Sequence, residues 1–147
     1  MKYARTVIIS ALLLVATSLA AQCQERQIVI AAIPFAFTVE NTPLPAGTDT
    51  ISTLYPYNMI KVRSADGRRV AWIAAIPSSK LEGAQRTKLV FHRFVDEYFL
   101  VQVWEQGSKV HRDLRSGDRA REFAKNGSSM QIETILANAG TNSNQQH

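Results

Sequence analysis

Residues 87–107, "TKLVFHRFVDEYFLVQVWEQG", decide the fold class of this chain. Aromatic and β-branched residues, which favour strands, fill both arms of the segment, and charged residues lie at its middle. The segment is therefore predicted to form a β-hairpin. Both faces of its second arm, "YFLVQVW", are largely apolar. This pattern indicates a central strand that is covered on both sides.

The register of this hairpin stays open, because neither Gly nor Asn specifies its turn. A loop at Val95-Asp96 pairs Phe91 with Leu100, whereas a loop at Asp96-Glu97 pairs Phe91 with Gln102. The choice decides which side chains face one another across the two strands.

Residues 58–77, "NMIKVRSADGRRVAWIAAIP", predict a second hairpin with a two-residue type I′ turn at Asp66-Gly67. This turn places Lys61 opposite Trp72, where the ammonium and the ring would form a cation–π contact. One face of the hairpin is uniformly apolar and is expected to meet the core. That face consists of Ile60, Val62, Ala71, Ile73 and Ala75.

Residues 33–52, "IPFAFTVENTPLPAGTDTIS", predict a strand, a corner and a second strand. Phe35, Phe37 and Val39 recur with period two, as in a half-buried strand. The sequence "LPAG" fits a type I turn. Asp49, in the second extended run, is unusual because Asp is depleted in strands.

The C-terminal part predicts a short strand at 108–114, a short helix within 116–127 and a closing strand at 130–136. Ser116 is the candidate N-cap of the helix, and Asn126-Gly127 ends it. A stripe of Ala120, Phe123 and Ala124 is expected to dock the helix on the sheet.

The strand pattern predicts an all-β, mainly antiparallel domain over residues 24–137. The expected architecture is a small β-sandwich or a partly open barrel, with one short C-terminal helix packed on it. Residues 138–147 are polar, small and uncharged, and a disordered tail is expected there.

Residues 1–23 carry the pattern of a cleaved signal peptide, with basic residues followed by an apolar run and small residues. The apolar run is shorter than a membrane-spanning helix, so no transmembrane span is expected in the mature chain. We therefore predict export to the periplasm or beyond the cell. Lipid anchoring through Cys23 is not expected, because Gln22 precedes it instead of a small residue.

Charge and motifs exclude several classes of function. The full chain has 17 basic and 12 acidic residues, and the signal peptide carries two of the basic ones. The resulting mildly basic surface is not typical of nucleic-acid binding. No Gly-rich nucleotide loop, no G-x-S-x-G elbow and no paired histidine spacing is present. We therefore predict no cofactor, no catalytic residue and no metal ligand.

The run from Lys109 to Lys125 holds six basic and three acidic residues and is the best candidate for contact with a partner. The partner would be an anionic component of the cell envelope or another protein. The alternative is a solvated helix face with local ion pairs. The predicted partner-binding residues are Lys61, Trp72, Arg112, Arg115, Arg119 and Arg121.

Taken together, "IPFAFTVENTPLPAGTDTIS", "IKVRSADGR", "KLVFHRFVDEYFLVQVW" and "LRSGDRAREFAK" resemble a family of short, exported bacterial proteins of unknown function. The resemblance covers nearly the whole mature chain and implies export and a small β-rich domain. It implies no chemistry. Three residues depart from the family pattern: Ala36 replaces an acidic residue, Asp49 a tyrosine and Val95 a glycine. With Asp49 in place of a core tyrosine, we expect a looser first corner or a carboxylate turned to solvent.

Three functions follow as hypotheses. The first is a non-enzymatic, envelope-associated binding or structural module. The second is a carrier of a small apolar ligand, for which the sequence offers the aromatic residues Phe91, Phe94, Phe99 and Trp104. The third and least favoured is a hydrolase that uses His92 or His111.

Overall fold

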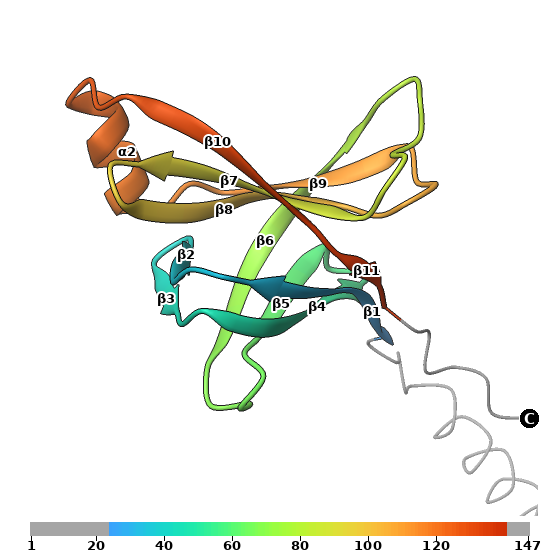
Figure 1. Cartoon of the computed structure of the whole chain (residues 1–147). Helices are drawn as coiled ribbons and strands as arrows, with labels where there is room; N and C mark the ends of the chain where they lie inside the picture. Colours follow the sequence, from blue (N-terminus) through green and yellow to red (C-terminus); the bar gives the residue numbers. More distant parts are fainter. Residues whose placement is uncertain (1–23, 141–147) are drawn as a thin grey trace, which may run out of the picture.

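The computed structural model describes residues 24–140, which form two packed β layers and one helix (Figure 1). The first layer comes from β1 (Gln24–Ile33), β4 (Gly47–Tyr55) and β5 (Met59–Arg63). Between β1 and β4, β2 (Phe37–Val39) and β3 (Thr42–Leu44) form a small hairpin that pairs with the second layer. The remaining elements are β6 (Val70–Ser79), β7 (Lys88–Phe94), β8 (Glu97–Trp104), β9 (Val110–Leu114), α2 (Asp118–Lys125), β10 (Met130–Leu136) and β11 (Asn138–Ala139). This arrangement confirms the predicted fold class. The predicted signal peptide lies outside the described residues.

One long strand connects the two layers. The strand order is β10-β7-β8-β9-β6-β5-β4-β1-β11, and the sheet is not closed into a barrel. The first half of β6 pairs with β5, whereas its second half pairs with β9. At the opposite corner, β10 pairs with β7 and the following β11 pairs with β1. The layers therefore cross at β6 and at the β10–β11 corner (Figure 1).

The apolar core lies between the layers. It is built from the inward faces of β1, β4, β5, β6, β7 and β8 and includes Ile33, Ile51, Ile60, Ile73, Leu89, Phe91 and Leu100. The predicted apolar face of the β5–β6 hairpin is buried in this core. The predicted pairing of Lys61 with Trp72 is confirmed.

The turn of the β5–β6 hairpin differs from the predicted type I′ turn. Ser64 N–H donates to Arg69 O, and Gly67 N–H donates to Ser64 O, so four residues form the loop. Only Gly67 in this loop has a positive φ, of 67°. The prediction was wrong because Asp66 bonds locally: its Oδ1 accepts hydrogen bonds from Ser64 Oγ at 2.6 Å and Arg68 N–H at 3.0 Å.

The β7–β8 hairpin adopts the register with its loop at Val95-Asp96, which pairs Phe91 with Leu100. Val95 has a φ of 57°. A bulge between Val90 and Phe91 interrupts the ladder. Because β8 lies between β7 and β9 and is largely buried on both faces, the prediction of a covered central strand is confirmed.

The first corner forms differently from its prediction. Ladder pairing covers only Phe37–Val39, and the tight turn falls at Glu40-Asn41 instead of in "LPAG". Glu40 has a φ of 55°. The physical reason is tertiary. The backbone of Gly117 packs so closely that a Cβ there would lie 1.7 Å from the Glu40 carbonyl oxygen.

Helix α2 ends at Asn126 and Gly127 as predicted, but its start is different. Its N-cap is Gly117 instead of Ser116, and no side chain of its own caps it. The Asn41 side chain performs this role from the β2–β3 turn, because its Oδ1 accepts the Asp118 N–H at 2.9 Å. The helix therefore begins where the small hairpin meets it.

The docking of α2 on the sheet is confirmed through Ala120 and Phe123, whereas Ala124, the third residue of the predicted stripe, is exposed. Ala120 is buried against Phe94 and Phe99, and Phe123 packs against the same cluster. The rings of Phe94 and Phe123 are stacked at 5.6 Å. The helix therefore covers the outer face of β7 and β8 at one end.

The C-terminal segment contains a further correction. Asn138–Ala139 forms β11 on the edge of β1, where Val29 pairs with Ala139, so the predicted disorder from residue 138 is wrong there. This pairing depends on a strand more than one hundred residues earlier. Residues 141–147 lie outside the described part of the chain. Within residues 24–140, no helix is long and apolar enough to cross a bilayer.

Candidate binding site

Two of the predicted partner-binding residues, Lys61 and Trp72, lie side by side on the outer face of β5 and β6. The Lys61 ammonium lies 5.3 Å from the centre of the Trp72 ring, as expected. It also donates to both carboxylate oxygens of Glu25 at 2.7 Å, and Lys61 is 7 % exposed. The hydrogen bond from Lys61 lowers the pKa of Glu25. The charge of Lys61 is therefore balanced inside the protein.

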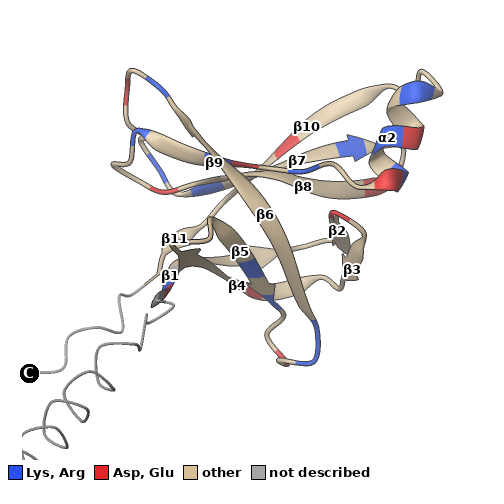
Figure 2. Ribbon diagram, turned by 180° about the vertical axis from the view of Figure 1, so that it is seen from behind, with Lys and Arg blue, Asp and Glu red and all other residues tan. Residues whose placement is uncertain are grey.

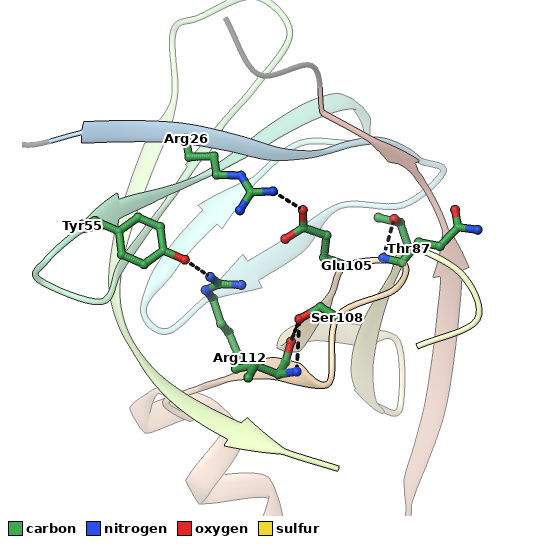
Figure 3. A network of polar contacts seen from close by, with 8 residues as sticks. Arg26, Tyr55, Thr87, Glu105, Ser108 and Arg112 are labelled. Carbon is green, nitrogen blue, oxygen red and sulfur yellow. Dashed lines mark hydrogen bonds and ion pairs between the residues drawn. The ribbon is translucent and has the colours of Figure 1, made fainter. Parts of the chain in front are cut away.

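A third predicted residue, Arg112, joins the two layers. Its guanidinium donates to the Tyr55 hydroxyl oxygen at 2.6 Å, and nearby Arg26 pairs with Glu105 at 2.7 Å. Figure 3 shows that both contacts run from the β1 and β4 layer to the β8–β9 region. The geometry makes Arg112 a contact between layers.

The helix arginines are also paired within the fold. Arg119 donates to both carboxylate oxygens of Glu97, at 2.7 and 3.2 Å, and Arg121 pairs with Asp118. Basic and acidic segments alternate along α2 in Figure 2. This pattern matches the alternative of a helix face with local ion pairs. Arg115 is exposed between β9 and α2. The six predicted residues do not form one patch.

Four basic residues that form no ion pair within the described chain lie close together elsewhere. Lys80, Arg86 and Lys88 lie on or beside the β6–β7 connection, and Lys109 lies between β8 and β9. The two connections adjoin, because Lys80 N–H donates to Lys109 O at 2.9 Å. We call the layer of β7, β8, β9 and β10 the upper layer and that of β1, β4 and β5 the lower layer. Both connections lie at the end of the upper layer opposite α2 (Figure 2).

Three of these cations border a surface hollow of about 450 Å³, which we call the Trp104 hollow. Its lining includes Lys80, Glu82, Arg86, Lys88, Trp104 and Leu136. A second hollow of about 400 Å³ adjoins it and shares Gln85, Arg86 and Leu136. The ammonium groups of Lys80 and Lys88 lie 4.7 and 5.0 Å from the centre of the Trp104 ring. An aromatic ring attracts these cations without neutralising them.

The Trp104 ring is held from below by a polar network. It stacks on His111 with ring centres 4.0 Å apart, and its Nε1–H donates to Gln102 Oε1 at 3.1 Å. Gln102 in turn donates to Asp113 Oδ1 at 2.8 Å, and Ser78 Oγ donates to the other oxygen of Asp113. Strands β6, β8 and β9 thus fix the floor of the hollow.

Ser78, His111 and Asp113 are the residue types of a hydrolytic triad, but their hydrogen bonds connect them differently. In such a triad, histidine accepts the proton of the serine hydroxyl. Here the Ser78 hydroxyl donates to Asp113, and His111 Nε2 lies 3.4 Å from that same carboxylate. The arrangement positions Trp104 and provides no activated Ser78.

The second histidine packs against an aromatic side chain. His92 lies edge-on to Phe94, with ring centres 6.5 Å apart, and burial lowers its pKa. Within residues 24–140, no group of three His, Cys, Asp or Glu side chains could hold a metal ion.

The aromatic residues named for a carrier do not line one pocket. Phe91 lies in the core, edge-on to Phe35 and Phe37 at 5.2 and 5.4 Å. Phe94 and Phe99 pack under α2, and Trp104 forms the floor of the hollow. Three separate packing environments therefore account for them.

Asp49 corrects an expectation from the sequence. Its carboxylate points neither to solvent nor into a looser corner: the residue is fully buried on β4. Neither carboxylate oxygen has a hydrogen-bond partner, and Thr53 Oγ1, on the same strand, also has none. Burial, with a smaller contribution from the charge of Asp66, raises the pKa of Asp49 to about 6. The sequence alternation indicated this burial, because it places Asp49 on the same face of the strand as Ile51 and Thr53.

Sequence reasoning missed the Trp104 hollow. Its only trace in the sequence is three basic residues and one acid within "KLEGAQRTK", residues 80–88. No protein-family model, curated protein or solved structure matches the chain.

Proposed function

We propose that this protein is an exported, non-enzymatic module of the cell envelope that binds an anionic component at the Trp104 hollow. The proposal includes the export and the family resemblance expected from the sequence. The observation that carries it is the grouping of Lys80, Arg86 and Lys88 around one hollow, with no ion pair to any of them within the described chain. An incoming anion would not have to break an internal ion pair.

The floor of the hollow supports the same function. Trp104 holds the ammonium groups of Lys80 and Lys88 in place, and Trp104 is itself held by His111 and Gln102. Ordering flexible lysines before binding lowers the entropy cost of association. Glu82 is the one acidic side chain that lines the hollow, so the local field is positive.

The test is binding of the full chain to isolated envelope fragments at low and at physiological salt. Wild-type protein should bind at low salt and be released as salt rises, because salt screens exposed charges. The variant Lys80→Ala/Arg86→Ala/Lys88→Ala should lose this binding.

A charge-matched control removes three cations elsewhere, as Arg63→Ala/Arg115→Ala/Lys125→Ala. These residues are exposed and form no ion pair in the described chain. The control should bind like wild type. Equal loss in both variants would show that net charge, and not the hollow, drives the interaction.

A further inference from the structure

We infer that the anionic component is the surface of a lipid bilayer, and that the outer face of β7, β8 and β10 docks on it. This inference rests on the proposed function and names its partner. The docking face comprises the three cations of the Trp104 hollow and three exposed apolar side chains beside them: Leu81, Ile132 and Leu136.

The apolar part of this face is exposed to solvent. Leu81, Ile132 and Leu136 are 95 %, 65 % and 55 % exposed. Ile132 and Leu136 project from the same side of β10, which pairs only with β7 and forms an edge of the upper layer. Contiguous exposed apolar side chains on a small domain mark a site of interaction.

The cationic and apolar parts are neighbours in space. Leu136 lines both adjoining hollows together with Arg86. Leu81 sits between Lys80 and Glu82, which both line the Trp104 hollow. In Figure 1 the β6–β7 connection and α2 rise on the side of the upper layer that faces away from the lower layer. The segments that carry both kinds of side chain therefore lie on one side of the upper layer.

Charge complementarity selects an anionic bilayer as the occupant. A bilayer offers a layer of phosphates above an apolar interior, so a protruding leucine can enter while lysines stay at the phosphates. A dissolved polyanion would engage Lys80, Arg86 and Lys88 but leave Leu81 and Leu136 in water. The lipid surface is the partner that uses both features.

The first experiment is co-sedimentation of the exported chain, after removal of the predicted signal peptide, with phosphatidylcholine vesicles that contain or lack phosphatidylglycerol. Binding should require phosphatidylglycerol. Each of Lys80→Ala, Arg86→Ala and Lys88→Ala should weaken it about fivefold, the usual contribution of one cation near an anionic surface.

Apolar variants separate insertion from charge. Leu81→Ser and Leu136→Ser leave the net charge unchanged and should each weaken binding by about tenfold, because a leucine side chain then no longer leaves water. The control is Tyr57→Ser, at an exposed residue between β4 and β5 whose 67 % exposure lies between those of Leu81 and Leu136. This control should bind like wild type.

Insertion can also be observed directly. In the same exported chain, an environment-sensitive dye on Leu81→Cys should shift its emission to the blue when anionic vesicles are added. The same dye on Tyr57→Cys should not shift. Unchanged emission at residue 81, or equal binding to vesicles with and without phosphatidylglycerol, would overturn the inference.

The outcomes for the two proposals are distinct. Salt-sensitive binding to lipid-free envelope fragments without binding to vesicles would overturn the lipid surface and keep the proposed function. Absence of binding to both would overturn both. Binding to vesicles that Lys80→Ala and Leu81→Ser each weaken supports the inference.

Discussion

At the residue scale, Asp49 is an acidic side chain that the fold buries in apolar surroundings. A carboxylate in an apolar core carries the full cost of leaving water unless hydrogen bonds offset that cost. No such bond reaches Asp49 in the described structure, and burial raises its pKa to about 6. The protein therefore folds more favourably with this carboxyl group protonated.

The sign of the resulting pH dependence follows from linkage. The pKa of Asp49 rises from 3.8 to about 6 on folding, so its contribution to stability is complete below about pH 4. That contribution is lost as the pH rises through about 6, and the total loss is of the order of 3 kcal/mol. Asp49→Asn should flatten this slope and raise the free energy of unfolding at neutral pH, measured by urea titration across this pH range. Asp96→Asn, in an exposed turn, should leave the slope unchanged; an unaltered slope in Asp49→Asn would contradict this account.

At the element scale, the turns and caps show where the folded chain departs from ideal local chemistry. Val95 occupies the left-handed region with a φ of 57°, although a β-branched side chain is unfavourable there. The start of α2 depends on Asn41, a side chain 77 residues earlier in the chain. A separate prediction follows from each of these two features.

Val95→Gly should stabilise the β7–β8 hairpin by about 1 kcal/mol, because glycine adopts a positive φ without steric cost. Chemical denaturation measures this difference. Val110→Gly is the matched control: this strand residue does not have a positive φ, so glycine should lower stability there. Equal destabilisation by both substitutions would show that Val95 is not strained.

Removal of the long-range cap should matter more than removal of the sequence-predicted one. Asn41→Ala should cost about 1 kcal/mol of unfolding free energy, the usual effect of a lost N-cap. Ser116→Ala should change it by less than about 0.5 kcal/mol, because Ser116 is exposed and caps nothing. If Ser116→Ala lowers the stability measured by thermal and urea unfolding more than Asn41→Ala does, Ser116 and not Asn41 caps the helix.

At the scale of the whole molecule, β6 belongs to both layers and therefore couples their stability. Its first half pairs with β5 and its second half with β9, so neither layer can unfold without loosening a strand of the other. The contacts of Arg26 with Glu105 and of Arg112 with Tyr55 add a second connection (Figure 3). One cooperative unit is the expected result.

The two tryptophans provide the test of this cooperativity. Trp72 lies on the β5 side and Trp104 on the β8 side, so Trp104→Phe and Trp72→Phe each leave a reporter in one layer. Within each variant, the urea midpoint from fluorescence should coincide with that from far-ultraviolet circular dichroism, as in a two-state transition. Separate midpoints within one variant would show that the layers unfold independently.

Local sequence patterns determined much of this fold. Alternation predicts the strands, the position of Asp66-Gly67 predicts the register of the β5–β6 hairpin, and Asn126-Gly127 ends α2. These features depend on residues within a few positions of one another, or on which face of a strand is apolar. These features can be predicted from a single sequence, because residues that recur with the period of a strand or helix lie on the same face of that element.

Only the tertiary structure decided how polar groups are partnered. It selected the Val95-Asp96 register, capped α2 with Asn41, buried Asp49 and balanced Arg119 with Glu97. It also placed Lys80 and Lys88 over Trp104. The partners come from strands distant in sequence, and the energy of a charge depends on which groups surround it. For that reason the sequence indicated a basic run at 109–125, whereas the fold groups three cations without an ion pair, Lys80, Arg86 and Lys88, around the Trp104 hollow.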